Sequence, residues 1–312
     1  MSRSTRAIQA AAWTVLLATS AHADRPRILL TGYWPPSNEA VRPFSQSAAQ
    51  NPGGWIGEDW EGRGYDIVAY FPEFVPANCF NCGVGSGDLQ VDYQDTSLDF
   101  WAIADAIKPV AIITFSRGFI NRSWELEMNQ FNRTNWFQDY LPPLLPTPNP
   151  PDASVPAGTL RLSTLPVNAI VQAVAADHPM LTPYICFTQD GGGFLSEFIA
   201  YHGVWYQSVH ADPSDPDRCV AAGHVHVGGL IDWPTARAAT ETTLRVLTDH
   251  IDGLLFAAED IDRDGSVGSS DLALLLGAFG PCPAQAPCDA DLDGDGAVTA
   301  ADIAALLGAW TP

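Results

Sequence analysis

The chain has few basic side chains and almost no lysine. Of its 312 residues, 15 are lysine or arginine and 36 are aspartate or glutamate, which gives a formal net charge of −21, and Lys108 is the single lysine. Proteins that bind nucleic acid present a basic face to the phosphates. The composition therefore argues against nucleic acid as a partner, and the surplus of carboxylates favours cation binding.

Long hydrophobic runs are also missing. No segment reaches the roughly 20 apolar residues that a membrane-spanning helix needs. At the start of the chain Arg3 and Arg6 precede a short apolar stretch, and small residues follow up to Ala23. This order is typical of a secretory signal peptide over residues 1–23, cleaved near Ala23. We expect a secreted, cell-surface or periplasmic protein without a membrane span.

Six cysteines in an exported chain indicate three disulfides. Short spacing favours two local pairs, and the two remaining cysteines are left for each other. The expected pairs are Cys79 with Cys82, Cys282 with Cys288, and Cys186 with Cys219. The first pair could instead be half of a redox or zinc site, but no second Cys or His pair completes such a site.

Apolar runs alternate with helical patterns over the first 255 residues. Strands are expected at 27–32, 65–71 and 110–115, and a helix capped by Asp95 or Thr96 lies between the last two. The run at 110–115 is apolar on both faces, which is typical of a parallel sheet covered by helices. The fold class is therefore α/β, with a three-layer sandwich around a mostly parallel sheet.

A glycine-rich stretch near the middle of the chain carries a candidate nucleophile. A buried strand at 184–187 leads into a tight turn at 190–193, and a helix begins near Phe194. Ser196 then lies in the first helical turn, where free backbone N–H groups and the positive end of the helix dipole can hold an oxyanion. The simpler interpretation is a strand–turn–helix joint in which Ser196 only starts the helix.

The segment from Thr188 to Glu197 resembles the nucleophile segment of pyroglutamyl peptidase I (pyrrolidone-carboxylate peptidase), which reads Asn-Thr-Ala-Gly-Thr-Phe-Val-Cys-Asn. Ser196 stands where that family has its cysteine. A serine hydroxyl is a weaker nucleophile than a thiol and needs a well-aimed base. The resemblance implies an amide or peptide hydrolase whose activity depends on this replacement.

The resemblance covers roughly residues 27 to 255, in the family's order. The segment 124–132 is similar to the family's Ile-x-x-Glu-Arg-x-Ala-x-Asn and implies Glu127 as the acid, with Glu125 as the competitor if the register slips by two. His226 stands where the family has its catalytic histidine. Ser196, His226 and Glu127 are thus implied as nucleophile, base and orienting acid, as in serine triads. His224 shares a strand face with His226, and such a pair could alternatively bind a metal.

Other segments follow the same family order. The loop after the first strand resembles Thr-Gly-Phe-x-Pro-Phe-Gly, which implies Tyr33 and the additional Trp34 as substrate-binding residues, although Pro36 replaces the second phenylalanine. The proline-rich segment 140–158 is expected to be a surface loop, or a lid over the site. A helix is expected at 167–176. Another should run from Pro234 to about Leu255, with a buried stripe at Leu244, Leu247, Ile251 and Leu254.

Two acidic segments of twelve residues, 260–271 and 291–302, repeat at an interval of 31 positions. Each has acids at positions 1, 3, 5 and 12, glycine at 6 and valine at 8, which is the pattern of oxygen ligands around a calcium ion. Position 7 would contribute a backbone carbonyl. The predicted ligands are Asp260, Asp262, Asp264, Ser266, Asp271, Asp291, Asp293, Asp295, Ala297 and Asp302.

Each acidic loop leads into a helix, expected at 272–279 and 303–310. A duplicated loop–helix unit resembles dockerin type I repeats, which implies two Ca²⁺ sites and a cohesin-like protein as a possible partner. A disordered acidic tail is the alternative, but the two repeats agree position by position. The predicted domains are a signal peptide at 1–23, an α/β domain at 24–256 that needs no cofactor, and a calcium module at 257–312.

Two classes of function follow from these patterns. The first is an exported hydrolase that acts on a peptide or small amide through Ser196. The second is a catalytically inactive member of the fold that works as a binding or attachment protein, with the calcium module as its active part. The distance between the Ser196 hydroxyl and the His226 ring is the observation that separates them best.

Overall fold

The computed structural model describes residues 25–79, 83–188, 192–284 and 288–311. The expected signal peptide at 1–23 lies outside these ranges. The same holds for Cys82 and for the first part of the expected turn at 190–193.

A six-stranded sheet forms the centre of the larger part of the chain. Its strand order is β2–β1–β3–β8–β4–β7. Neighbouring strands run parallel throughout, except that β4 is antiparallel to β8. The strands are β1 (Arg27–Tyr33), β2 (Asp66–Tyr70), β3 (Ala111–Arg117), β4 (Ser123–Glu127), β7 (Thr182–Cys186) and β8 (Ala221–Val227).

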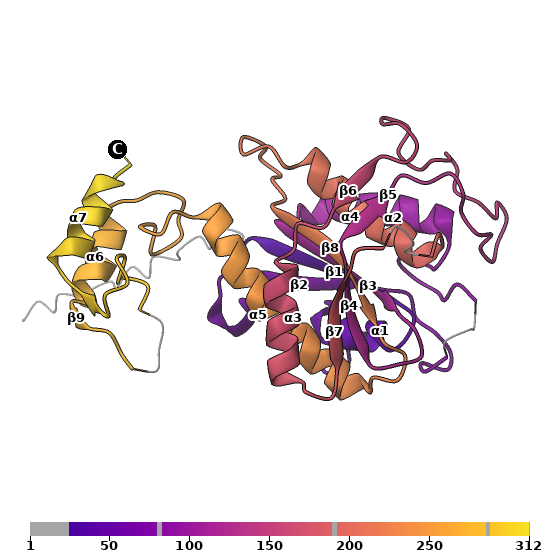
Figure 1. Cartoon of the computed structure of the whole chain (residues 1–312), viewed down its shortest axis with the longest axis horizontal. Helices are drawn as coiled ribbons and strands as arrows, with labels where there is room; N and C mark the ends of the chain where they lie inside the picture. Colours follow the sequence, from indigo (N-terminus) through magenta and orange to yellow (C-terminus); the bar gives the residue numbers. More distant parts are fainter. Residues whose placement is uncertain (1–24, 80–82, 189–191, 285–287, 312) are drawn as a thin grey trace, which may run out of the picture.

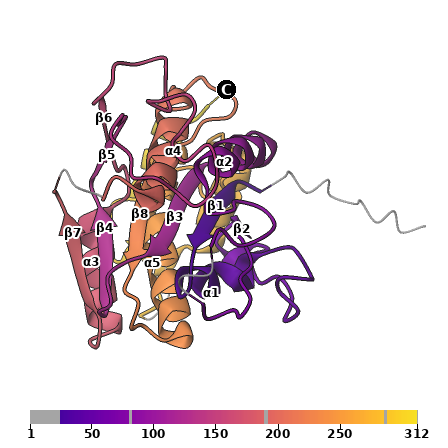
Figure 2. The same cartoon turned by 90° about the vertical axis from the view of Figure 1, so that its right-hand side faces the viewer.

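Helices cover both faces of this sheet (Figures 1 and 2). One face packs against α1, α3 and α5, and the other packs against α2 and α4. This arrangement confirms the predicted three-layer α/β sandwich. The helices are α1 (Ser37–Val41), α2 (Tyr93–Ile107), α3 (Val167–Asp177), α4 (Leu195–Val209) and α5 (Trp233–Leu255).

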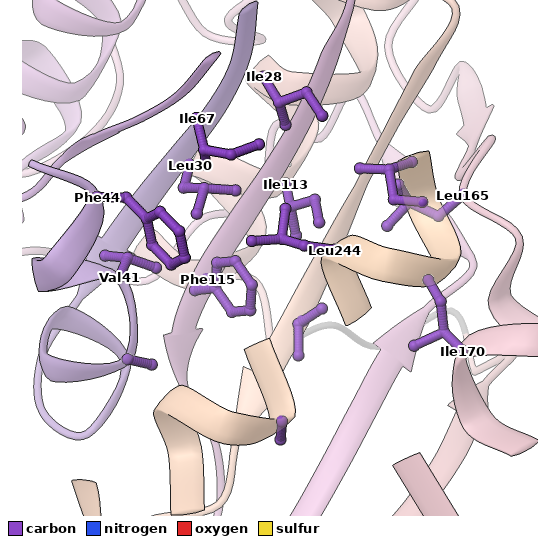
Figure 3. Packing of buried hydrophobic residues seen from close by; sticks show 14 of the residues in the cluster. Ile28, Leu30, Val41, Phe44, Ile67, Ile113, Phe115, Leu165, Ile170 and Leu244 are labelled. Carbon is purple, nitrogen blue, oxygen red and sulfur yellow. The ribbon is translucent and has the colours of Figure 1, made fainter. Parts of the chain in front are cut away.

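The core on the α5 side follows from the alternation of side chains along the strands. Leu30 and Ile113 point toward Leu244 of α5 and are fully buried (Figure 3). Their neighbours Leu29 and Ile112 pack into the second core, under α2 and α4. Burying one such side chain stabilises the fold by about 1.5–3 kcal/mol, so strands that are apolar on both faces hold both helical layers.

Two expected details of these elements were wrong. Helix α2 begins at Tyr93 because the carboxylate of Asp92, rather than of Asp95, accepts the N–H of Gln94 at 2.8 Å and that of Asp95 at 3.3 Å. The strand expected to be buried at 184–187 is β7, an edge strand that is only half-buried, because no further strand covers it.

The cysteines agree with the expectation only in part. Cys282 and Cys288 form the predicted disulfide, with a Cα–Cα distance of 5.7 Å. Cys186 and Cys219 are both free, so their predicted pairing was wrong. Cys186 on β7 and His224 on β8 both pair with Glu127 of β4, the strand between them. Cys219 precedes His224 by five residues, or roughly 16 Å of extended chain. Disulfides need Cα atoms within about 7 Å. Cys79 is disulfide-bonded.

A hairpin and two short 3₁₀ helices complete this part of the chain. The hairpin pairs β5 (Asn129–Phe131) with β6 (Leu160–Leu162), and the 3₁₀ helices are η1 (Arg42–Phe44) and η2 (Trp60–Gly62). The proline-rich segment 140–158 connects the two hairpin strands and contains neither helix nor strand. It is therefore a loop, as predicted.

The acidic repeats form a small unit beyond the end of α5 (Figure 1). Its elements are α6 (Ser269–Gly277), β9 (Gly280–Pro281), β10 (Ala297–Val298) and α7 (Ala300–Gly308). Its core pairs equivalent residues of the two repeats: Val267 with Val298, and Leu275 with Leu306. In the described ranges of the whole chain, no helix is both long and apolar enough to cross a bilayer.

Candidate active site and acidic loops

A pocket of about 250 Å³ opens at the end of the central sheet. It brings together the three predicted catalytic residues from remote parts of the chain, together with the competitor Glu125. It also contains three residues that were not singled out from the sequence, and Gly192 from the predicted turn. The lining consists of Arg117, Gly118, Phe119, Glu125, Glu127, Gly192, Ser196 and His226.

The histidine and both acids project from one face of the sheet, beneath α4. Strand β8 pairs His226 with Glu125 and His224 with Glu127 on β4. Side chains alternate along a strand, so all four residues lie on the same face. The sequence left Glu125 as a competitor of Glu127, and both residues line the pocket.

Glu127 makes the close contact with the histidine. Its Oε1 lies 2.9 Å from His226 Nδ1, whereas the nearest oxygen of Glu125 lies 3.8 Å away. Burial alone would lower the pKa of His226, but the negative charge and hydrogen bond of Glu127 raise it. Burial would raise the pKa of Glu127, but the charge and hydrogen bond of His226 hold it well below its usual range. The pair is thus an ordered carboxylate–imidazole unit.

His224 lies under this unit and is held in place by two hydroxyls. Its Nδ1 is 2.8 Å from Thr114 Oγ1, and its Nε2 is 2.8 Å from Ser116 Oγ. Complete burial is the main reason why the pKa of His224 is lowered to about 3, and the charge of His226 acts in the same direction. The ring is therefore neutral. One oxygen of Glu127 and ring nitrogens of His224 and His226 lie within 4.8 Å of one another. Because both nitrogens of His224 already contact hydroxyls, the arrangement does not favour a metal site.

Helix α4 places Ser196 in its first turn, as predicted. Gly203 lets the helix approach the sheet closely, because a Cβ there would lie 3.3 Å from Thr114 Cγ2. Among the described residues, no acceptor lies within hydrogen-bond range of the Ser196 N–H, and no partner lies within range of its hydroxyl. The amide is thus available to an oxyanion. The serine shares the pocket with His226 but is not hydrogen-bonded to it.

A buried ion pair fixes the start of this helix. Glu197 is fully buried, forms a salt bridge with Arg133, and accepts the N–H of Gly193 at 2.9 Å. This pair was not found from the sequence, because the two residues are 64 positions apart in the chain and no motif links Arg133 to Glu197. It holds Gly193 against the helix that carries Ser196.

The two predicted substrate-binding residues do not line this pocket. Tyr33 is fully buried, and its hydroxyl contacts Thr96. Trp34 is 8% exposed and stacks on Phe194 with ring centroids 6.4 Å apart. The first-strand loop therefore supports the wall behind the α4 N-terminus and contributes little surface to a ligand.

Among the residues that sequence reasoning missed, Arg117 carried a usable signal. It is the first charged residue after the apolar run of β3, and ligands of α/β sheets bind outside the carboxyl ends of parallel strands. Gly229 lies beside its side chain, because a Cβ at that glycine would be 2.9 Å from Arg117 Nε. Phe119, two residues further, is 73% exposed at the pocket.

The two acidic loops have the same internal geometry. Asp271 accepts the N–H groups of Ile261 and Gly268, each at 2.7 Å. Asp302 repeats both contacts with Leu292 and Thr299, again at 2.7 Å. Both aspartates are the third residue of their helix and accept the N–H of the N-cap residue, and in α7 the Thr299 side chain completes a capping box. The helices therefore begin at Ser269 and Ala300, three residues earlier than predicted.

The carboxylates of each loop converge as a calcium site requires. One oxygen from each of Asp260, Asp262 and Asp271 lies within 4.8 Å of the others, and the second loop gathers Asp291, Asp293 and Asp302 in the same way. Asp264 and Asp295 each accept the N–H two residues ahead at 2.9 Å, which stabilises the loop turn. These oxygen-only donor sets fit a hard divalent cation.

Comparison with solved structures relates 72–73% of the chain to one fold. Pyroglutamyl peptidase I of Bacillus amyloliquefaciens is similar at 15% identity, over 72% of this chain and 98% of that one, with a TM-score of 0.50. Pyrrolidone carboxyl peptidase of Thermococcus litoralis is similar at 14% identity, over 73% and 96%, with a TM-score of 0.50. A mutant pyrrolidone carboxyl peptidase of Pyrococcus furiosus is similar at 14% identity, over 72% of this chain and 99% of that one, with a TM-score of 0.51. The chain shares the fold of these proteins.

Comparison with family models concerns the acidic repeats. Residues 258–308 match the dockerin type I domain. This match confirms the predicted resemblance and supports calcium as the ion of the C-terminal module. Comparison with curated proteins gave no match.

Proposed function

We propose that this chain is an exported amide or peptide hydrolase with the fold of pyroglutamyl peptidase I, attached to a dockerin-like calcium module. Ser196 is the nucleophile, His226 the general base, and Glu127 the acid that orients it. The observation that carries the proposal is the 2.9 Å contact between Glu127 and His226 inside the pocket that Ser196 also lines. A buried, oriented imidazole beside a helix N-terminus is the arrangement that a serine hydroxyl needs.

The reaction follows from these positions. The Ser196 oxygen attacks the carbonyl carbon of the amide, and its proton passes to the neutral ring of His226. The N–H of Ser196 stabilises the negative oxygen, since it has no acceptor among the described residues. His226 then protonates the departing amine as the C–N bond breaks. A water molecule, deprotonated by His226, splits the ester, which releases the acid and returns the proton to Ser196.

A catalytically inactive protein is the second candidate. It is favoured by one observation: no hydrogen bond joins Ser196 to His226 among the described residues. Catalytic hydrogen bonds are often long without substrate and shorten when it binds. The two candidates differ in whether substrate brings the hydroxyl into reach of the ring.

An amide hydrolysis assay with three forms of the chain separates the candidates. The natural protein should release the amine from pyroglutamyl or aminoacyl amides, and Ser196→Ala should lose this activity by at least a hundredfold. Activity in Ser196→Cys alone would identify the natural protein as an inactive member of the fold. Activity retained in Ser196→Ala would overturn the assigned nucleophile.

We further propose that the acidic loops hold two Ca²⁺ ions and that the module, from residue 257 onward, binds a cohesin-like protein. The convergent carboxylates of both loops support this proposal. Such a module suits an extracellular or cell-surface protein, in agreement with the signal peptide expected at 1–23. Pull-down with cohesin should succeed in calcium and fail with a chelator. Retention that is equal in both conditions would contradict a calcium-dependent module.

A further inference from the structure

The pocket contains a second carboxylate that the proposed triad does not use. Glu125 lies directly opposite His226 in the β4–β8 register, and only 6% of the residue is exposed. Its nearest oxygen is 3.8 Å from His226 Nδ1, which is beyond hydrogen-bond distance. It nevertheless lines the pocket together with Ser196.

The two glutamates differ in the groups that surround their carboxylates. Glu127 uses Oε1 for His226 and accepts the side-chain N–H of Gln130 on Oε2 at 3.2 Å. Glu125 faces the Tyr184 hydroxyl and the Cys186 thiol, which are neutral groups. Among the described residues, no cationic side chain hydrogen-bonds to Glu125. His226 lies within ion-pair distance of Glu125, but when its ring is neutral the buried charge of Glu125 has no matching cation, which is costly.

The charge balance of the pocket indicates what would match it. A general base must be neutral before it accepts a proton, so His226 carries no charge in the reactive state. Among the described residues, the lining then holds two carboxylates and the guanidinium of Arg117, which leaves a net charge of −1. A ligand with one positive charge complements this lining, whereas a neutral lactam ring leaves the charge unmatched.

We propose that Glu125 binds the α-ammonium group of the substrate, so that the enzyme acts on amides of amino acids with a free amino terminus. This inference rests on the proposed hydrolase function. The ammonium group is two bonds from the carbonyl carbon that Ser196 would attack. A pocket of about 250 Å³ that is lined by both residues can hold one aminoacyl unit in contact with both. Glu125 is then a specificity-determining residue.

The test measures binding without turnover. Full-length Ser196→Ala is titrated calorimetrically with leucinamide, N-acetyl-leucinamide and N-succinyl-leucinamide, whose amino-terminal side carries a positive, neutral or negative charge. Leucinamide should bind at least tenfold more tightly than either acylated ligand. Adding Glu125→Gln should abolish this difference and leave the affinity for N-acetyl-leucinamide unchanged. Glu58→Gln, at an exposed position outside the pocket, is the matched control.

The outcomes distinguish this inference from the proposed function. If Glu125 only supported His226 or the fold, its replacement would affect all three ligands alike, and the inference would be overturned. Tighter binding of the succinyl ligand would assign the pocket to Arg117 and an anionic substrate instead. Glu125→Asp, which keeps the charge, should retain part of the preference. Ligand binding that depends on Glu125 would stand even if the natural chain hydrolysed none of these amides.

Discussion

At the scale of single residues, the account depends on which carboxylate orients His226. A slip of two residues along a strand leaves the side chain on the same face. Strand periodicity therefore could not decide between Glu127 and Glu125, and only the family resemblance favoured Glu127. The structure makes Glu127 the contact at 2.9 Å and leaves Glu125 at 3.8 Å. The sequence located the strand and the sheet face that carry both acids. Which acid contacts His226 depends on a diagonal contact between β4 and β8.

The first prediction concerns Glu127→Gln. The amide removes the negative charge that raises the pKa of His226, so this pKa should fall. Because His226 must be neutral to act as base, activity should increase with pH through an inflection above the ordinary histidine value of about 6.5. In Glu127→Gln that inflection should move to lower pH, and kcat/KM should drop roughly 10³–10⁴-fold, as in other serine triads.

The pH profile of kcat/KM checks this prediction, with Glu39→Gln as a control because Glu39 forms its ion pair with Arg42 outside the pocket. An unchanged inflection in Glu127→Gln would mean that another group sets the pKa of the base.

Burial explains why the position of the Tyr33 side chain could not be predicted from the sequence. Tyr33 was predicted as a pocket wall because it follows the first strand, as the matching phenylalanine does in the similar family. Its side chain turns into the core instead and contacts Thr96 of α2. Sequence position indicates which loop a residue occupies, but the packing of a distant helix decides whether its surface is reachable.

At the scale of elements, each acidic loop overlaps with the first turn of the helix that follows it. Position 12 of each loop is also the third residue of a helix, where Asp271 and Asp302 accept the N–H of the N-cap residue. The ligand pattern was readable because it repeats after 31 positions. The helix starts were misplaced because the same carboxylate was assigned to the loop alone.

The second prediction therefore uses Asp302. Asp302→Ala removes the acceptor of the Thr299 N–H and a calcium ligand, so α7 should fray without calcium, with a cost of about 0.5–1.5 kcal/mol for each lost hydrogen bond. Asp302→Asn keeps a cap acceptor and should preserve α7 in the absence of calcium. Both variants should lose the extra protection that calcium gives to α7. Hydrogen exchange of the α7 amides, with and without chelator, measures both effects.

Wild-type exchange in calcium-free Asp302→Ala would show that the capping box does not stabilise α7. A full calcium response in both variants would remove Asp302 from the ligand set.

At the scale of the whole molecule, the period of the apolar residues was enough to predict the layers. Runs such as 110–115, apolar on both faces, require a covered parallel sheet, and the sheet order is consistent with this. Contacts between remote segments were not predictable in the same way. The absence of a Cys186–Cys219 bond and the salt bridge between Arg133 and Glu197 depend on how far apart strands and loops come to lie.

One such contact joins the calcium module to the α/β domain. Arg263, the fourth residue of the first acidic loop, forms a salt bridge with Asp252 of α5 at 2.9 Å. It also donates to the backbone carbonyl of Arg63 at 3.1 Å. Asp252 in turn accepts the Tyr65 hydroxyl at 2.5 Å. The equivalent position of the second loop is Gly294, so only the first loop can make this contact.

The third prediction is that Arg263→Ala loosens this attachment. Partly exposed ion pairs are worth roughly 1 kcal/mol or less, so the fold should persist while the linker at 256–259 becomes easier to cleave. Limited proteolysis in calcium should show faster cutting there than in the natural chain. Arg237→Ala, which removes an ion pair within α5 itself, is the matched control. Equal cleavage of Arg263→Ala and the natural chain would refute a stabilising contact between the two parts.

The most direct test of the central claim is the mass of the full-length protein after exposure to a fluorophosphonate, followed by peptide mapping. An activated serine should gain a single phosphonyl group at Ser196, and Glu127→Gln or His226→Ala should slow this labelling at least a hundredfold. An unlabelled Ser196, or labelling that is indifferent to both substitutions, would contradict a serine nucleophile activated by His226.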